Sequence, residues 1–185
     1  MIGRCVLPAI AAIALPVPAQ AEGQVDPWSC PAWTAIAERD YGNPPLLLQA
    51  IGRVEAGEAI DQGRAGAWIL DIGGQMVQPT SLASALDTII LSREPSIDVG
   101  CLQINLRAHG AAVLARGGLL YPKYNAAYGA WYLATLFHKT RIWTMAVSAY
   151  HAGTNSRRGQ LYCHRVAAAV VDLQRSSGAG LNLPC

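Results

Sequence analysis

The chain has 185 residues, of which 52% are hydrophobic and 14% are charged, with 14 Lys and Arg residues against 12 Asp and Glu residues. This length suits one domain with a sizeable core, and the apolar composition excludes an intrinsically disordered protein. Because the basic residues are scattered and the total charge is small, we expect no nucleic-acid partner.

The first 21 residues have the pattern of a secretory signal peptide. Arg4 precedes an apolar run over residues 6–17, and Ala19 and Ala21 occupy the −3 and −1 positions of a signal-peptidase site. Prolines interrupt the run, which is shorter than the roughly 20 residues that a membrane-spanning helix needs. We therefore expect export to the periplasm, cleavage after Ala21, and a mature domain of residues 22–185 without stable membrane insertion.

Proline and glycine predict the limits of the first helices of that domain. A short helix over residues 31–40 is expected to stop at Gly42. A second helix is expected to begin at Pro44, with Asn43 as its N-cap, and to end at Gly57.

The rest of the chain predicts one β element and further helices. Residues 67–77 predict a small β-hairpin that turns at two glycines. The next helix is expected to be capped by Thr80 and Ser81 and to carry one apolar side, formed by Leu82, Leu86, Ile89 and Ile90. An extended segment is predicted at residues 96–105, and helices are predicted at residues 107–116, 125–139, 143–150 and 161–175. The predicted fold class is mainly α, a single helical domain with one small β-hairpin.

Four cysteines remain after the predicted cleavage: Cys30, Cys101, Cys163 and Cys185. An even number in an exported chain predicts two disulfides, and the spacing leaves three connectivities open. The alternative is a Cys/His peptidase with a thiol nucleophile at Cys101 and His109 as its base, which an oxidising compartment disfavours.

Acidic and basic residues are segregated along the chain. Residues 22–100 contain 11 acids and 4 bases, whereas residues 101–185 contain 9 bases and one acid. This division favours attraction between the two halves across the fold. The alternative is a basic face for an anionic polymer.

Glu55 occupies a position at which an apolar residue is expected. In the second predicted helix, Leu48, Ile51, Gly52 and Glu55 follow the spacing of one buried face. Burial and the negative end of the helix dipole both disfavour the carboxylate anion, so the pKa of Glu55 should be raised. These properties make Glu55 a candidate general acid.

Four segments resemble the motifs of the SLT-type lytic transglycosylase domain, which is related to goose-type lysozyme. Residues 54–57 (V-E-A-G) resemble its E-S-G signature, and residues 98–105 (D-V-G-C-L-Q-I-N) resemble its G-L-M-Q-I-N segment. Residues 122–133 match P-x-x-N-x-x-x-G-x-x-Y-L, and residues 149–153 (A-Y-H-A-G) resemble A-Y-N-A-G. The segments occur in the family's order and spacing, which implies an α+β lysozyme-like fold.

The resemblance implies that Glu55 cleaves the bond between N-acetylmuramic acid and N-acetylglucosamine in peptidoglycan glycan strands and forms a 1,6-anhydro sugar. It also implies that Gln103 and the region of Leu102 line the sugar cleft and that the Tyr150 hydroxyl lies near Glu55. His151 replaces an Asn of the motif, which makes it either a pH-sensitive neighbour of the cleft or a structural residue. No cofactor is implied. The small size of the chain suggests an enzyme that opens the wall for a secretion or conjugation apparatus.

Other interpretations of Glu55 remain open. In a hydrolytic muramidase, Glu55 would be the acid and Asp98 would position water, although Asp98 is better placed to cap a turn. A structural Glu55 would instead pair with Arg53 or Arg93, and a non-catalytic glycan-binding module would keep the fold without the chemistry. The histidines show no close pair at metal-ligand spacing with a carboxylate, so we expect no metal.

Overall fold

The structure is a computed structural model that describes residues 25–114, 118–152, 156–178 and 180–185. The predicted signal peptide lies outside these residues. The described chain is mostly helical with one small antiparallel sheet, which confirms the predicted fold class. Within the described residues, every helix is too short or too polar to span a bilayer.

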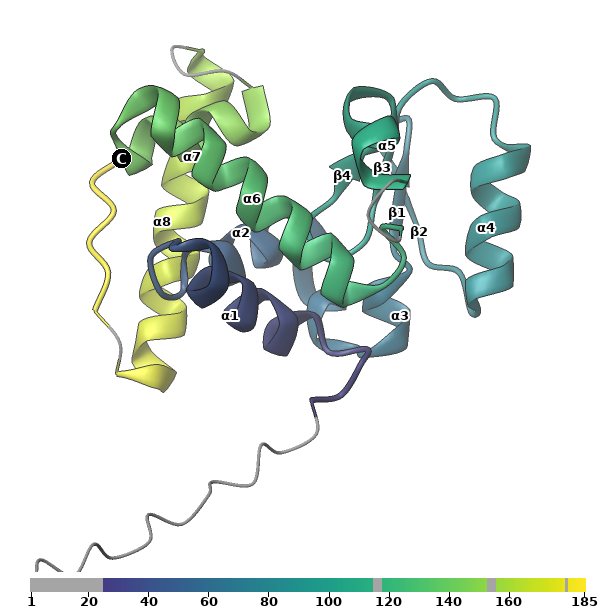
Figure 1. Ribbon diagram of the computed structural model, residues 1–185, viewed down its shortest axis with the longest axis horizontal. Helices are drawn as coiled ribbons and strands as arrows, with labels where there is room; N and C mark the ends of the chain where they lie inside the picture. Colours follow the sequence, from purple (N-terminus) through teal and green to yellow (C-terminus); the bar gives the residue numbers. More distant parts are fainter. Residues whose placement is uncertain (1–24, 115–117, 153–155, 179) are drawn as a thin grey trace, which may run out of the picture.

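Helices form one side of the molecule and the sheet forms the other (Figure 1). The helical side contains α1 (Cys30–Tyr41), α2 (Leu47–Ala56), α6 (Pro122–Thr140), α7 (Trp143–Ala152) and α8 (Arg157–Ser177). Its core is apolar, and its fully buried side chains include Leu48, Ile51, Leu133, Val147 and Val166. The long helix α6 crosses the molecule and packs on both α1 and α7.

The sheet has four short strands, β1 (Leu70–Ile72), β2 (Gln75–Val77), β3 (Ile97–Val99) and β4 (Ile104–Asn105), in the order β2-β1-β3-β4. The predicted hairpin is confirmed as β1 and β2, paired from Leu70 opposite Val77 to Ile72 opposite Gln75. The predicted extended segment adds two strands, so the sheet is larger than the expected hairpin.

Short helices surround the sheet. The 3₁₀ helix η1 (Gly57–Asp61) and α3 (Arg64–Ala67) lead into β1, and neither was predicted. Helix α4 (Leu82–Leu91) begins at the expected cap, where the Ser81 hydroxyl accepts a hydrogen bond from Ser84 N at 3.0 Å. Helix α5 (Leu106–Leu114) follows β4 and lies near the mouth of the cleft described below.

The predicted start of the second helix was wrong. Helix α2 begins at Leu47, because Pro45 follows Pro44 and disfavours a helical conformation at the residue before it. Its first N–H groups are satisfied by Glu38 of α1, whose buried carboxylate accepts hydrogen bonds from Leu46 N at 2.9 Å and Gln49 N at 3.0 Å. Asn43 is buried and donates instead to Ala130 O of α6 at 3.2 Å.

Two disulfides join the cysteines. One links Cys30 to Cys101, and the other links Cys163 of α8 to Cys185 at the end of the chain. These pairs settle the connectivity that the spacing left open. Because Cys101 is buried and bonded to Cys30, it has no free thiol, and the Cys/His peptidase is excluded for this structure.

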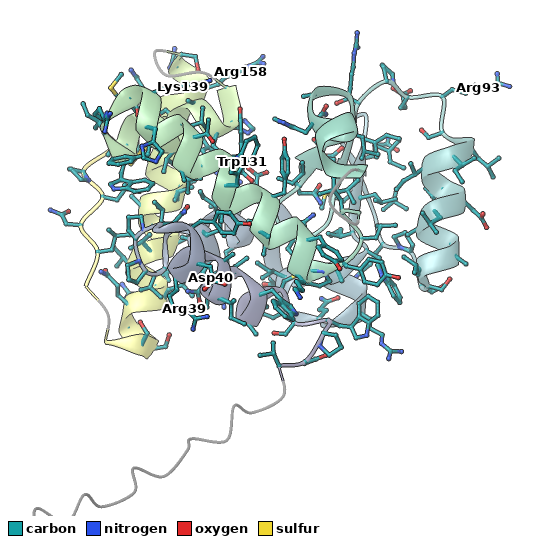
Figure 2. The ribbon with its side chains drawn as sticks, viewed as in Figure 1. Arg39, Asp40, Arg93, Trp131, Lys139 and Arg158 are labelled. Carbon is teal, nitrogen blue, oxygen red and sulfur yellow. A yellow bond between two sulfur atoms is a disulfide. The ribbon has the colours of Figure 1, made fainter. Side chains whose placement is uncertain are left out.

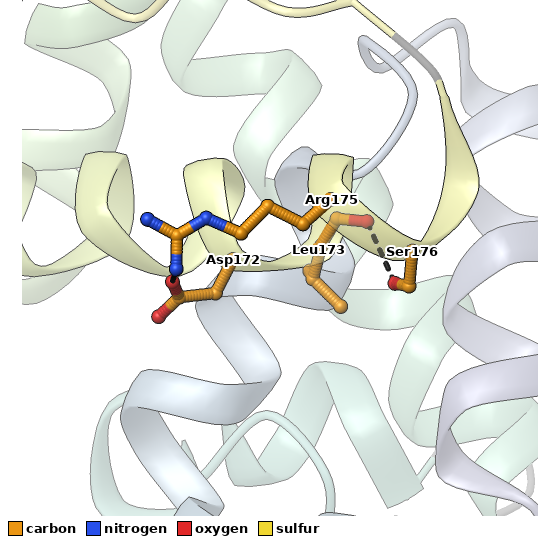
Figure 3. A network of polar contacts seen from close by, with 4 residues as sticks. All are labelled: Asp172, Leu173, Arg175 and Ser176. Atoms are coloured by element: carbon orange, nitrogen blue, oxygen red, sulfur yellow. Dashed lines mark hydrogen bonds and ion pairs between the residues drawn. The ribbon is translucent and has the colours of Figure 1, made fainter.

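The expected attraction between the acidic and basic halves does not take the form of ion pairs in the described part of the chain. There, the ion pairs join Arg39 to Asp40, Arg53 to Asp61, and Arg175 to Asp172, and each pair lies within one half of the sequence. Figure 3 shows the last of these along α8, with the Ser176 hydroxyl donating to Leu173 O nearby. The basic charges of the second half therefore remain on the surface.

Candidate active site

Glu55 lies in the last turn of α2, on the face that Leu48, Ile51 and Gly52 bury in the core. The helix ends one residue later, and Gly57 takes a positive φ of 58° at its C-cap, as glycine does without strain. Glu55 is half-buried and lines a cleft of about 460 Å³ between the helical side and the sheet. The carboxylate therefore opens into a cleft.

The surroundings of Glu55 keep its proton bound up to neutral pH. The pKa of Glu55 is raised to about 7, with burial as the largest cause and the charges of Asp98 and Asp71 acting in the same direction. A hydrogen bond from Tyr162 and the charge of Arg165 lower this pKa. Near pH 7 the side chain is divided between acid and carboxylate, so it can both donate and accept a proton.

Tyr162 is the residue that contacts Glu55 directly. Its hydroxyl, on α8, donates a hydrogen bond to Glu55 Oε1 at 2.6 Å. The ring of His151 stacks on the Tyr162 ring, with centroids 4.6 Å apart and planes 6° from parallel. Sequence reasoning missed Tyr162, because it lies 107 residues from Glu55 and outside the motifs that carried the resemblance.

Burial raises the pKa of the Tyr150 hydroxyl, and the charge of Glu55 raises it further. Tyr150 lines the same cleft as Glu55, and its hydroxyl donates to Leu102 O at 3.4 Å. Gly129 of α6 allows this arrangement, since a Cβ there would lie 2.3 Å from Leu102 Cδ1 and 3.2 Å from the Tyr150 hydroxyl. Tyr150 therefore braces the turn beside the cleft.

Comparison with protein families identifies part of this chain. Residues 74–163 match the family model of the transglycosylase SLT domain. Over this segment, the chain is similar to the transglycosylase SLT domain. Comparisons with curated proteins and with solved structures find no match.

The SLT match confirms the family resemblance and indicates lytic transglycosylase activity on peptidoglycan. It includes Asp98, Gln103, Tyr150, His151 and Tyr162. Glu55 precedes the matched segment, so its assignment depends on the helix pattern, the cleft and the pKa. Enzymes of this family act on the cell wall and are typically exported, which agrees with two disulfides in the chain.

Asn125 fixes the turn between β3 and β4. This turn includes Cys101, Leu102 and Gln103, which belong to the segment that resembles an SLT motif. The fully buried Asn125 amide accepts a hydrogen bond from Leu102 N at 2.9 Å and donates to Val99 O at 2.8 Å and Leu119 O at 3.0 Å. Gly100 has a φ of 76°, and a Cβ there would lie 2.5 Å from Asn125 Nδ2. Asn125 therefore fixes the backbone of this turn.

The two residues at the end of this turn have different environments. Leu102 is fully buried and its side chain is part of the core, so the prediction that it contacts substrate was wrong for the side chain. Gln103 lines the cleft with a φ of 44°, and its Nε2 donates to Gly100 O at 2.9 Å and Ile69 O at 3.3 Å. Its buried Oε1 has no hydrogen-bond partner among the described residues.

Asp98 lies in the cleft on β3, between two other polar residues of the sheet. It is opposite Asp71 on one neighbouring strand and opposite Asn105 on the other, and all three line the cleft. Asn105 Nδ2 donates to Asp98 Oδ1 at 2.6 Å. Burial raises the pKa of Asp98, the hydrogen bond from Asn105 lowers it, and the charge of Asp71 raises it. Sequence reasoning missed Asp71, although its place in the predicted hairpin was the available signal.

Two histidines complete the walls of the cleft. Burial lowers the pKa of His109 and of His151, and the charges of Arg165 and Arg158 lower that of His151 further. The charge of Asp98 raises both values. His109 Nδ1 lies 2.9 Å from the Tyr128 hydroxyl. Burial therefore favours the neutral form of both rings near pH 7.

The structural alternatives for Glu55 find no support. Arg53 is paired with Asp61 at 3.2 Å, and Arg93 lies beyond α4 at the far edge of the sheet side (Figure 2). In the described part of the chain, no group of three or more His, Cys, Asp or Glu residues is arranged to hold a metal ion.

Proposed function

We propose that this protein is a lytic transglycosylase that cleaves the β-1,4 bond between N-acetylmuramic acid and N-acetylglucosamine, with Glu55 as the catalytic acid and base. The observation that carries this proposal is a half-buried Glu55 with a pKa of about 7, facing a cleft within a chain that is similar to the SLT domain over residues 74–163. A general catalyst works best when its pKa lies near the working pH.

The reaction uses the same carboxyl group twice. Protonated Glu55 first donates its proton to the glycosidic oxygen, and the bond from that oxygen to C1 of the muramic acid breaks. The resulting carboxylate then accepts the proton of the C6 hydroxyl as O6 bonds to C1, which gives the 1,6-anhydro product and restores the acid. The substrate's own N-acetyl group can stabilise the positive C1, so this route needs no protein nucleophile.

Tyr162 supports the first of these steps, because it stabilises the carboxylate that remains once the proton has left. Its hydroxyl donates to one oxygen of Glu55, which favours the carboxylate form and limits the rotation of the side chain. The other oxygen is then available to the sugar. Gln103, Tyr150 and His151 line the same cleft, and we assign them to contacts with the bound glycan.

A hydrolytic muramidase is the second candidate, because Asp98 lines the cleft and its charge acts on Glu55. Against it, the Asp98 carboxylate is held by Asn105, which gives it a structural role. The two reactions can be distinguished by their products, because hydrolysis leaves reducing ends and the transglycosylase leaves 1,6-anhydro ends.

The test is product analysis by mass spectrometry on purified peptidoglycan. Wild type should release anhydro products, and Glu55→Gln should lower their rate by about 10²- to 10⁴-fold, because the proton donor is lost. Glu58→Gln, which removes an exposed acid three residues away, is the matched control and should retain activity.

Reducing ends that disappear in Asp98→Asn would favour the muramidase. Unchanged biological activity of Glu55→Gln would favour a non-catalytic glycan-binding module.

We further propose that residues 1–21 are removed on export, that residues 22–185 form the periplasmic enzyme, and that it opens the wall for a secretion or conjugation apparatus. The signal-like sequence, the disulfides and the small size of the chain support this proposal. N-terminal sequencing of the periplasmic protein should begin at Glu22, and a retained N-terminus would contradict the cleavage.

A further inference from the structure

A second groove lies on α6, and most of its walls are aromatic. It is formed by Tyr41 at the end of α1 and by five residues of α6, namely Lys123, Tyr124, Ala127, Tyr128 and Trp131. We call it the α6 groove. Its volume is about 350 Å³, and none of these residues lines the cleft that holds Glu55.

Three rings of the α6 groove keep large exposed areas. Tyr41 is 42% exposed, Tyr124 is 40% exposed and Trp131 is 37% exposed. Figure 2 shows Trp131 midway along α6, above Arg39 and Asp40 at the end of α1. Large aromatic side chains contribute most when they are buried, so several exposed ones in one groove indicate a binding surface.

The aromatic surface continues beyond the groove towards the start of α6. Tyr121 lies against Tyr124, with ring centroids 6.3 Å apart, and Trp28 stacks on Tyr121 at 5.7 Å. Tyr121 is itself 41% exposed. The rings thus form a row along the first half of α6, which suits an extended ligand made of repeating units.

The chemistry of this row fits a sugar chain. One face of a pyranose ring presents C–H groups that pack on an aromatic ring, while its hydroxyl and acetamido groups stay in water or bond to the polar ends of Tyr and Trp. Lys123 adds a positive charge, with its Nζ 5.6 Å from the Trp33 ring centroid. A cation at this position complements the carboxylates that peptidoglycan carries on its muramic acid peptides.

We propose that the α6 groove binds a glycan strand of peptidoglycan outside the catalytic cleft. The polymer is named from the proposed function, whereas the preference for a sugar chain comes from the groove itself. Tyr128 lies between the two sites, since its ring lines the groove and its hydroxyl contacts His109 of the cleft. When the cleft and the α6 groove bind the same cell wall, the effective affinity of the enzyme for the wall rises, while the cleavage reaction itself is unchanged.

The experiment uses the Glu55→Gln protein, so that the glycan is not consumed. The indole N–H signals of the five Trp residues are followed by NMR while a soluble tetrasaccharide of alternating N-acetylglucosamine and N-acetylmuramic acid is added to about 5 mM. Trp131→Phe removes one signal and so assigns it. The Trp131 signal should shift and saturate, while that of Trp143, which is stacked on Phe137, serves as the reference.

Binding to insoluble peptidoglycan gives the second measurement. In the same background, Tyr124→Ala and Trp131→Ala should each weaken co-sedimentation with the wall by about fivefold, and Trp131→Phe should restore most of it. Ile90→Ala removes an even more exposed apolar side chain from α4 and should have no effect.

An unmoved Trp131 signal together with unchanged co-sedimentation of the alanine variants would overturn the proposal and leave a protein partner as the occupant. Anhydro products test the catalytic function separately, so either proposal can fail without the other.

Discussion

At the scale of single residues, the proposed chemistry depends on whether Glu55 holds its proton. Glu55 is buried enough to hold it, Tyr162 donates to its oxygen at 2.6 Å, and His151 stacks on Tyr162. Tyr162 and His151 therefore place a hydrogen-bond donor, but no full positive charge, beside the Glu55 carboxylate. The pKa can therefore stay near 7 instead of returning to that of a solvated acid.

Tyr162→Phe should raise the pKa of Glu55 above about 7, because the hydroxyl that lowers it is removed. Activity requires protonated Glu55 and is lost as the pH rises through this pKa. The alkaline limb of the pH profile should therefore move to higher pH by about one unit. The measurement is the rate of anhydro-product release as a function of pH.

Tyr150→Phe is the matched control for this shift, since its hydroxyl donates to Leu102 O. It should leave the position of the alkaline limb unchanged. A limb that stays in place in Tyr162→Phe would show that Tyr162 does not tune Glu55.

Glu55 could be found from the sequence, but its partner could not. An acid at the fourth position of an apolar stripe stands out within one helix, because helical spacing fixes which residues share a face. Tyr162 is an ordinary aromatic residue of α8, and only the packing of α2 on α8 brings the two together. Tyr150 lines the same cleft, and its hydroxyl donates to Leu102 O.

At the scale of elements, the site depends on the turn between β3 and β4. This turn is held by Asn125 of α6 and by the Cys101 disulfide, and Gly100 supplies the positive φ. Without these contacts, the cost in conformational entropy of ordering the turn would not be offset. The packing of distant elements therefore fixes the position of Gln103.

Asn125→Ala should lower the free energy of unfolding by about 4 kcal/mol, because it leaves three buried backbone groups without partners. Urea unfolding measures the loss. Asn182→Ala, which truncates an exposed residue, should change stability little. A similarly small loss of stability in both variants would mean that the turn keeps its conformation without Asn125.

The two disulfides should differ in their effect on stability. Cys30 and Cys101 are 71 residues apart, whereas Cys163 and Cys185 are 22 apart. Replacing the first pair by Ser should cost about 1 kcal/mol more than replacing the second, since the longer loop restricts the unfolded chain more. Denaturant unfolding of the two double variants tests this order, and the reverse order would contradict it.

Helix limits were easier to predict than their contacts. Ser81 caps α4 as expected, because capping is a local interaction. The cap of α2 comes instead from Glu38, nine residues before Leu47, which no local rule predicts. Helix α4 was expected to carry an apolar side, of which Leu86 is 45% exposed and Ile90 is 74% exposed, since the helix lies at the margin of the sheet side (Figure 1).

At the scale of the whole molecule, acidic residues line the cleft and basic residues lie on the outer surface of the helical side. Glu55, Asp71 and Asp98 face the cleft from the acidic half of the sequence, while Lys139 and Arg158 are exposed at the end of the helical side (Figure 2). The basic residues in the second half of the sequence remain available to an anionic polymer. This agrees with the alternative interpretation of the charge segregation, a basic face for such a polymer. Peptidoglycan peptides carry carboxylates that suit these basic residues.

Arg158→Glu should weaken co-sedimentation with purified peptidoglycan by about threefold, and the difference should shrink between about 50 mM and about 500 mM NaCl because salt screens exposed charges. Arg93→Glu makes the same change of charge at the opposite end of the molecule and is the control. Equal effects of the two variants would show that net charge, rather than the basic end, governs binding.

The bond between Cys30 and Cys101 has a consequence for when the protein becomes competent. Cys101 sits between Gly100 and Leu102, in the turn that positions Gln103, so thiol oxidation is a step in assembling the cleft. A newly synthesised chain with reduced thiols lacks this covalent brace. A protein that cuts the wall would thus reach its full working shape only after maturation, away from the ribosomes that made it.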